Sequence, residues 1–136
     1  MTTNLDARLT SASPAAIGVF RIVSGFLFTV HGAAKLFAWP VDMGSGAIPA
    51  GSWPMWYAGV LELVLGLLIM VGLFTRVAAF IAGGHMAVAY FWMHQPQGLL
   101  PLENSGEAAV LFCFGFLLLA VIGGGAYALD TARGKS

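Results

Sequence analysis

The sequence predicts an all-α protein, an integral membrane bundle of four transmembrane helices. Hydrophobic residues make up 59% of the 136 positions and charged residues only 9%, whereas about a quarter of the residues in a typical soluble domain are charged. Four apolar stretches approach the roughly 20 residues that a helix needs to span a bilayer. The chain lacks the alternating pattern of barrel strands. We therefore expect helices, which satisfy their own backbone hydrogen bonds in lipid.

The four expected spans make one domain that covers residues 1–136. They are residues 15–37, 54–74, 77–92 and 106–129. Ser13-Pro14 precedes the first span as an N-cap and a proline at the first helical position. Trp39-Pro40 ends that span, and Thr75-Arg76 forms a tight turn between the second and the third. Gly123-Gly124-Gly125, late in the fourth span, is interpreted as close packing or a local break.

The distribution of positive charge predicts that both termini are cytoplasmic. Four basic residues fall on one side of the expected bundle; they are Arg8, Arg76, Arg133 and Lys135. Arg21 lies near the same side, and only Lys35 falls toward the other. The four tryptophans, a residue type that favours membrane interfaces, all fall on the opposite, outer side.

Charge and cysteine content exclude several classes of function. Six basic and six acidic residues give a formal net charge of zero. We expect no nucleic-acid partner, because no basic patch is present to neutralise phosphates. Cys113 is the one cysteine, so it has no partner for an internal disulfide or a cysteine-rich metal site, and we interpret it as an apolar filler. No expected helix carries a closely spaced pair of His, Asp or Glu residues, so we predict no metal site.

Regularly spaced glycines predict which helix faces pack together. Gly18, Gly25 and Gly32 recur every seven residues in the first span, and Gly59 and Gly66 repeat that spacing in the second. Small residues in a line let helix backbones approach closely in lipid, and a seven-residue spacing suits left-handed crossings of about 20°. We therefore interpret these glycines as packing seams.

Ionisable residues inside the spans are the most informative positions, because each costs about 2.5–3.5 kcal/mol at the centre of a membrane helix. On the first span, Arg21, His31 and Lys35 fall within an arc of about 80° at about 100° per residue. Glu62 shares the glycine face of the second span, and Glu107 begins the fourth. With alternating helix directions, all of these residues except Arg21 converge on one pocket in the outer leaflet.

Two interpretations of this pocket stay open. In the structural one, Lys35 and Glu62 form a neutral ion pair that fixes the helix register, and Glu107 favours the start of its helix through the helix dipole. In the functional one, a cation, a carboxylate and the His31 imidazole bind a polar headgroup and move protons. A quinone carbonyl or a small anion would suit such a site.

The remaining ionisable residues are interpreted as structural. Arg21 lies nearer the inner surface, where we expect it to pair with Asp130 or with a lipid phosphate. His85 is interpreted as a core histidine and His94 as an interfacial one. His31 and His85 are the one pair on different spans that would ligate haem, but their expected depths differ, so haem is not favoured.

Several motifs, in the same order along the chain, resemble the DoxX family. They are Arg21-x3-Gly25-x5-His31-Gly32-x2-Lys35-Leu36-Phe37, Glu62-x3-Gly66-x5-Gly72-Leu73-x-Thr75-Arg76-x-Ala78-Ala79, Asn104-Ser105-Gly106-Glu107-Ala108-Ala109, and the Gly123–Gly125 region followed by Ala128-Leu129-Asp130. The resemblance covers nearly the whole chain. Ser105 departs from it, because glycine is common at that position.

The resemblance implies a small protein of four helices in the bacterial plasma membrane, with a redox association. The related DoxD-type protein is a subunit of a thiosulfate:quinone oxidoreductase, and some DoxX-like proteins are linked to membrane complexes that handle sulfur or oxidative stress. The motif positions that it carries over to this sequence are Arg21, His31, Lys35, Glu62, Arg76, Glu107 and Asp130. Arg21, Arg76 and Asp130 are expected to be structural or to pair with lipid headgroups.

The functional expectation is an integral subunit of a redox complex, with an outer pocket for a quinone or a small sulfur-containing anion. No intrinsic cofactor is expected, so redox chemistry would come from a bound quinone or another subunit. The expected partners are the lipid membrane and other redox proteins, and a homo-oligomer is an open alternative. Two other functions stay open, a non-catalytic scaffold that anchors a partner complex and a small-molecule transporter, for which one bundle would need a second copy.

Overall fold

The computed structural model describes residues 2–134 and, over that range, contains helices and no strand, which confirms the predicted all-α class. The helices are α1 (Thr2–Ser11), α2 (Ser13–Phe37), α3 (Met55–Val71), α4 (Thr75–Ala89), α5 (Glu107–Ile122) and α6 (Leu129–Ala132). A π-helical turn, η1 (Tyr90–His94), and a 3-10 turn, η2 (Gln95–Gln97), continue α4. Lys135, counted above among the inner charges, lies outside the described residues.

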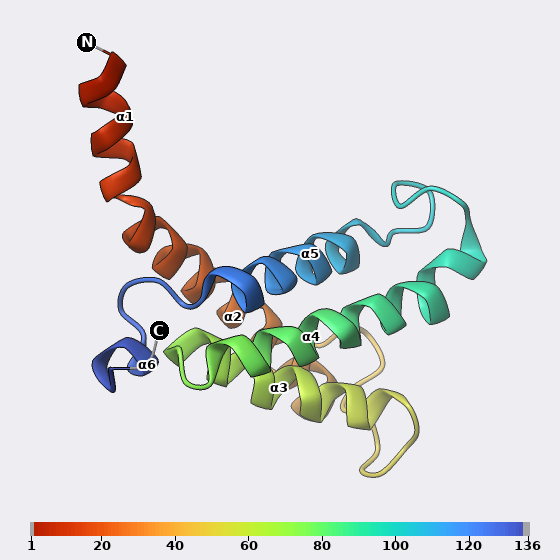
Figure 1. The fold of residues 1–136 in the computed structure, drawn as a ribbon. Coiled ribbons are helices and arrows are strands. Elements are labelled where there is room, and N and C mark those ends of the chain that lie inside the picture. The colour runs from red at the N-terminus through yellow and green to blue at the C-terminus, as the bar shows by residue number, and fades with distance from the viewer. Residues whose placement is uncertain (1, 135–136) are drawn as a thin grey trace.

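Helices α2 to α5 run alternately up and down (Figure 1). The connections over residues 38–54 and 98–106 lie at one end of the bundle, which we call the loop end. The turn over residues 72–74 and the segment 123–134 lie at the other, the termini end. Helix α1 extends away from the termini end. The alternating directions on which the predicted pocket depends are therefore present.

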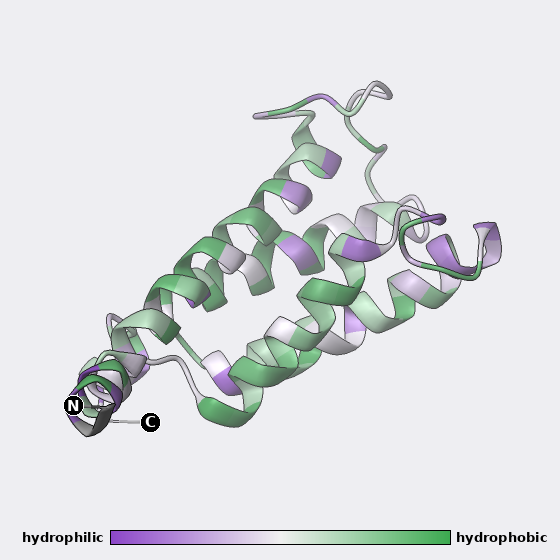
Figure 2. Ribbon diagram, turned by 90° about the horizontal axis from the view of Figure 1, so that it is seen from above, coloured by the Kyte–Doolittle hydropathy of each residue, from purple (hydrophilic) through white to green (hydrophobic). Residues whose placement is uncertain are grey.

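Two helical segments are long and apolar enough to cross a membrane by length and composition. They are α2, with 25 residues, and the continuous segment Thr75–Gln97, with 23. Helices α3 and α5 are apolar but shorter, with 17 and 16 residues. Figure 2 shows the long helices mostly in the colour of hydrophobic residues. Many large apolar side chains on their outer faces are exposed, as expected of helices that contact lipid.

Two expected spans have different boundaries in the structure. The third, expected to end at residue 92, continues to Gln97 because the π turn and the 3-10 turn prolong α4. The fourth, expected to run to residue 129, ends at Ile122. Gly123 has φ 91°, a left-handed conformation that favours glycine and ends the helix. The glycine run is thus a break, and it is also closely packed, because a methyl group added to Gly125 would lie 2.6 Å from the carbonyl oxygen of Pro14.

Four of the five predicted seam glycines, Gly25, Gly32, Gly59 and Gly66, lie at the contact between α2 and α3, whereas Gly18 faces the backbone of Ala126 after α5. A methyl group added to Gly25 would lie 2.6 Å from the backbone nitrogen of Met70 and 3.0 Å from the carbonyl oxygen of Gly66. Gly32 faces Leu63 and Gly59 in the same way. These contacts involve backbone atoms, which cannot move aside as a flexible side chain can. The two helices therefore approach more closely than any larger residue would allow.

Phe28 on α2, Ile69 on α3 and Phe116 on α5 form the centre of the core. The Phe28 and Phe116 rings meet edge to face, with centroids 4.9 Å apart. Small residues of α4, such as Ala79 and Ala82, are completely buried beside them. This core fills the middle of the bundle, whereas α2 and α5 have few contacts with each other.

The guanidinium of Arg21 closes the termini end of the bundle. Arg21 is completely buried and donates four hydrogen bonds to backbone carbonyls of other segments. The acceptors are Ile69 at 2.9 Å, Met70 at 2.5 Å, Gly124 at 2.8 Å and Ala126 at 3.1 Å. Among the described residues Arg21 makes no direct ion pair with Asp130, and its hydrogen bonds go to backbone carbonyls instead. The carbonyls at the end of α3 and after α5 carry the partial negative charge that a buried cation requires.

Asp130 and Arg76 instead cap helix ends. The two carboxylate oxygens of Asp130 accept hydrogen bonds from the backbone nitrogens of Phe74, at 2.9 Å, and Thr75, at 2.8 Å, at the start of α4. Arg76 donates to the carbonyls of Ala120 and Val121 in the last turn of α5. Both residues satisfy backbone groups that a helix end leaves without partners. These contacts support a structural role for Asp130 and Arg76 over pairing with lipid headgroups.

Substituting Gly25 by Ala should destabilise the protein by about 1–3 kcal/mol, because the added methyl group forces α2 and α3 apart. Thermal unfolding in mild detergent measures the change. The matched control is Gly84→Ala on α4, where an added methyl group has no neighbour within 4 Å among the described residues. An equal loss of stability in both variants would contradict the proposed seam.

Acidification should weaken the attachment of α6 to α4. Burial raises the pKa of the Asp130 carboxyl, but the hydrogen bonds from Thr75 and Phe74 and the charge of Arg133 lower it more, so the pKa lies below its ordinary value of 3.8. A depressed pKa stabilises the fold fully above the ordinary value, and this stability is lost as the pH falls through the lower pKa of the folded state.

Melting temperatures measured from neutral pH down to about pH 3 check this linkage. Asp130→Asn should lower the melting temperature at neutral pH, and its difference from the wild type should shrink on acidification. Asp6→Asn, the same change on the exposed helix α1, serves as the control. A constant difference between Asp130→Asn and the wild type across this range would contradict the capping role.

Candidate functional site

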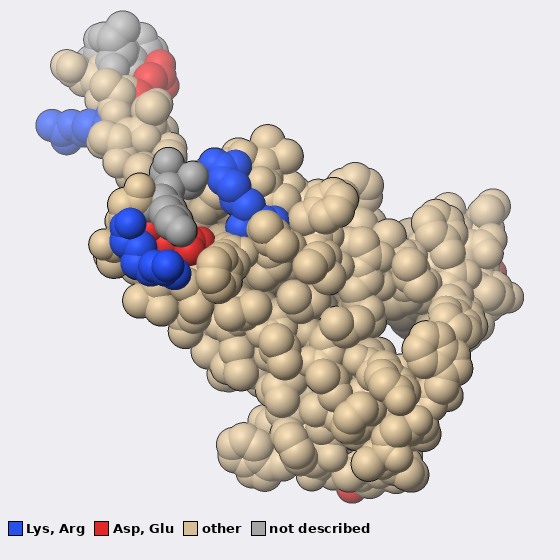
Figure 3. All heavy atoms as spheres, turned by 60° about the horizontal axis from the view of Figure 1, so that its bottom comes forward, with Lys and Arg blue, Asp and Glu red and all other residues tan. Residues whose placement is uncertain are grey.

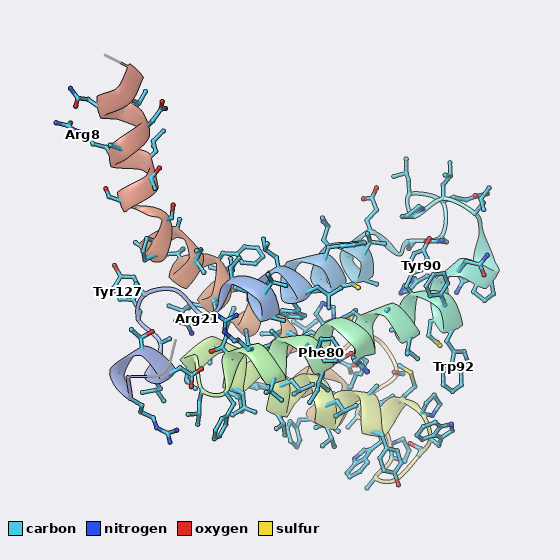
Figure 4. The ribbon with its side chains drawn as sticks, viewed as in Figure 1. Arg8, Arg21, Phe80, Tyr90, Trp92 and Tyr127 are labelled. Carbon is cyan, nitrogen blue, oxygen red and sulfur yellow. The ribbon has the colours of Figure 1, made fainter. Side chains whose placement is uncertain are left out.

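A cavity of about 530 Å³ lies at the loop end, between α2, α3, the extended α4 and α5. Its walls are largely apolar and aromatic, and the aromatic residues are Phe28, Trp53, Tyr57, Trp92 and Phe112. Its ionisable residues are His31, Lys35, Glu62, His85 and His94. Figure 4 shows Tyr90 and Trp92 at this end, far from Arg21 at the termini end. The volume falls within the usual range for sites that bind small molecules.

Lys35 and Glu62 form an ion pair in the wall of this cavity. Lys35 Nζ lies 2.6 Å from Glu62 Oε2, and the two side chains are 12% and 6% exposed. A methyl group added to Gly59, one turn before Glu62, would lie 3.1 Å from the Cβ atom of Lys35, so the glycine allows α2 to bring the lysine onto α3. The pair that the sequence analysis considered is therefore present, and it depends on the close helix contact.

His85 on α4 is a third member of this cluster. Its Nε2 atom lies 3.4 Å from Glu62 Oε1, so the two oxygens of one carboxylate face a lysine and a histidine. The ring also meets Phe28 edge-on, with centroids 6.2 Å apart. From the sequence, His85 was expected only as a core histidine, without a contact to Glu62. The available signal was an ionisable residue in the middle of an apolar helix.

His31 and Glu107 differ in their relation to the cavity. His31 lines it, with its ring edge-on to Phe112 at a centroid distance of 6.0 Å. Glu107 is exposed in the first turn of α5 and is not part of the lining. Its expected place in the pocket is therefore wrong, because the helix turns its side chain outward and the neighbouring Ala108 and Ala109 line the cavity instead.

The π turn after α4 shapes the mouth of the cavity. It places Trp92, Met93 and His94 in the lining, and π turns occur frequently at functional sites. His94 Nδ1 lies 3.1 Å from the backbone oxygen of Asn104, whose side chain in turn donates to the Tyr90 hydroxyl at 3.2 Å. These bonds hold the 98–106 connection beside the cavity. Sequence reasoning missed this arrangement.

Lys35, which lines the cavity, makes one side-chain hydrogen bond among the described residues. Lys35 carries three N–H donors, and its bond to Glu62 uses one of them. The ion pair carries no net charge. The site therefore offers the strong hydrogen-bond donor of a lysine without a net positive charge. His85 and Glu62 add groups that hold and move protons. Within residues 2–134, no three His, Cys, Asp or Glu side chains are placed to hold a metal ion.

The composition, the long apolar helices and this cavity define a small helical membrane protein with a buried polar cluster at one end. Comparison with known families gives the particular class. The DoxX family model matches residues 16–95, and the chain belongs to the DoxX family, as the sequence motifs indicated. The matched range contains Lys35, Glu62 and His85.

Two relatives match most of the chain. An uncharacterized protein of Haemophilus influenzae is 40% identical over 120 residues, which cover 86% of this chain and 90% of the relative. An uncharacterized membrane protein of Mycobacterium tuberculosis is 28% identical over 142 residues, which cover 93% of this chain and 86% of the relative. No solved structure matches the chain.

Removing one member of the ion pair should destabilise the protein more than removing both. Lys35→Met or Glu62→Gln alone leaves a buried charge without its partner, at a cost of about 3–5 kcal/mol. The double variant leaves no charge and should recover much of that loss. Unfolding of the four proteins in mild detergent gives the coupling energy as a double-mutant cycle. Simple additivity of the two single effects would contradict a buried, coupled pair.

Proposed function

We propose that the protein is a multi-pass subunit of a redox complex in the bacterial plasma membrane, and that its cavity binds the ring of a quinone. The observation that carries this proposal is the Lys35–Glu62–His85 cluster in the wall of an aromatic cavity. A quinone ring is flat and apolar, with carbonyl oxygens that accept hydrogen bonds. The cavity offers aromatic walls for the ring and free lysine donors for a carbonyl.

The charge of the cluster favours a neutral ring over a small anion. Glu62 already neutralises Lys35, so an anion would enter an apolar cavity without gaining an unpaired cation. Burial of an uncompensated charge is strongly unfavourable. A neutral carbonyl needs only a donor, which Lys35 supplies. We therefore favour the quinone over the sulfur-containing anion as the ligand.

Reduction of a quinone to a quinol takes up two electrons and two protons. Lysine, glutamate and histidine side chains exchange protons and not electrons, so this chain would hold the ring and relay the two protons from water to it, with His85 and the Glu62 carboxylate each binding a proton before passing it on. The electrons would come from a partner protein of the complex. This division of labour is the reason for proposing a subunit and not a self-contained enzyme.

The proposed topology has four spans with both termini in the cytoplasm. Figure 3 shows the charged atoms of the visible face gathered mostly at the termini end, which the positive-inside rule places in the cytoplasm. Helices α3 and α5 are about 26 Å and 24 Å long at the usual rise of 1.5 Å per residue. They are shorter than the hydrocarbon core of about 30 Å, so local thinning of the bilayer would accommodate them.

A non-catalytic scaffold is the second candidate function. Lys35 and Glu62 neutralise each other without a ligand. The close contact of α2 and α3 at the glycine seam is sufficient to explain why the two side chains meet. A scaffold needs only this stable bundle and a surface for its partner. Ligand binding therefore distinguishes the two candidates.

A tail-less benzoquinone should quench the fluorescence of the cavity tryptophans, Trp53 and Trp92, in a saturable manner. The double variant Lys35→Met/Glu62→Gln should bind at least tenfold more weakly, because it lacks a charged hydrogen bond worth about 1.5–3 kcal/mol. Glu107→Gln repeats one of the two changes outside the cavity and should bind like the wild type. Equal binding by the wild type and the double variant, or none by either, would favour the scaffold.

A further inference from the structure

A second hollow, an apolar groove of about 300 Å³, lies between α2 and α5. Phe20, Val23 and Leu27 line it from α2, and Leu111 and Phe116 line it from α5. The one hydroxyl in its lining, that of Ser24, bonds to the backbone oxygens of Phe20 and Arg21 on its own helix. The groove therefore presents no free hydrogen-bonding side chain, and its chemistry suits a hydrocarbon chain.

The groove adjoins the cavity at two shared residues. Phe112 and Ala108 belong to the lining of both hollows. On one side, the Phe112 ring meets His31 and Phe28, with centroid distances of 6.0 and 5.6 Å. On the other, it stacks on Phe116 at 5.5 Å. A single aromatic side chain thus stands between the polar cavity and the apolar groove.

The groove opens where the bundle is least closed. Helix α2 packs mainly on α3 and α5 mainly on α4, and contacts between α2 and α5 are sparse. Residues on the edges of the groove are exposed on the outer face; Leu111, for example, is 73% exposed. In a membrane this face meets the lipid chains. A hydrocarbon chain dissolved in the bilayer therefore reaches the groove without crossing water.

We infer that the groove between α2 and α5 holds the hydrocarbon tail of the molecule whose ring occupies the cavity. This inference rests on the proposed function and narrows its ligand to a membrane-dissolved, tailed quinone that enters sideways from the bilayer. Phe112 marks the passage from tail to ring. The continuity of the groove with the cavity identifies this tail as the occupant, in place of an unrelated lipid chain.

The test compares one benzoquinone ring with and without a decyl tail. Binding is measured by equilibrium dialysis of labelled ligand against protein in nanodiscs, with empty nanodiscs as a correction for partition into lipid. Leu111→Trp fills the groove. Leu118→Trp is the matched control, because Leu118 lies two turns along the same face of α5, is 54% exposed, and is not part of the groove lining.

Leu111→Trp should weaken binding of the tailed ring at least tenfold and change binding of the tail-less ring less than twofold. Leu118→Trp should change neither. Unchanged binding of the tailed ring in Leu111→Trp overturns the inference. The tail then lies outside this groove, and only lipid chains of the surrounding bilayer fill it. Failure of the wild type to bind the tail-less ring overturns the proposed function itself, and the inference with it.

Discussion

The close contact between α2 and α3 is the constraint on which the rest of the structure depends. Glycines at Gly25, Gly32, Gly59 and Gly66 bring the two backbones together where any side chain would collide. That approach brings Lys35 to within 2.6 Å of Glu62. The carboxylate then neutralises the charge of the lysine, which would otherwise be unfavourable inside the bilayer. The cavity exists because these two helices are tight while α2 and α5 are not. Packing and site chemistry therefore have the same origin.

The two ends of the bundle handle buried charge in different ways. At the termini end, Arg21 gives its hydrogen bonds to backbone carbonyls, which leaves that end packed. At the loop end, Lys35 lies in the cavity wall, and its bond to the Glu62 carboxylate uses one of its three N–H donors. A buried cation whose nitrogens all donate to backbone carbonyls is a structural element, whereas one with spare donors beside a cavity is suited to a ligand. This difference directs attention to only one end of the molecule.

The sequence was sufficient for features that depend on side-chain identity and spacing. Hydropathy located α2, and glycine spacing predicted the face that carries Lys35 onto Glu62. It was not sufficient for features that depend on backbone position. The partners of Arg21 are carbonyl groups, which every residue possesses and no motif reveals. The π turn arises from local hydrogen bonding that has no side-chain signature here, and His85 reaches Glu62 only because α4 packs beside α3.

The four hydrogen bonds from Arg21 to backbone carbonyls also affect the order in which the protein assembles. Arg21 is synthesised well before two of its four acceptors, Gly124 and Ala126, which follow it in the chain by 103 and 105 residues. Until then, α2 resides in the membrane with a cation that is only partly satisfied by the end of α3. The closing of the bundle therefore has to wait for the synthesis of Gly124 and Ala126. A chain truncated before residue 124 would retain its hydrophobic helices but lose the Gly124 and Ala126 carbonyls that accept hydrogen bonds from Arg21.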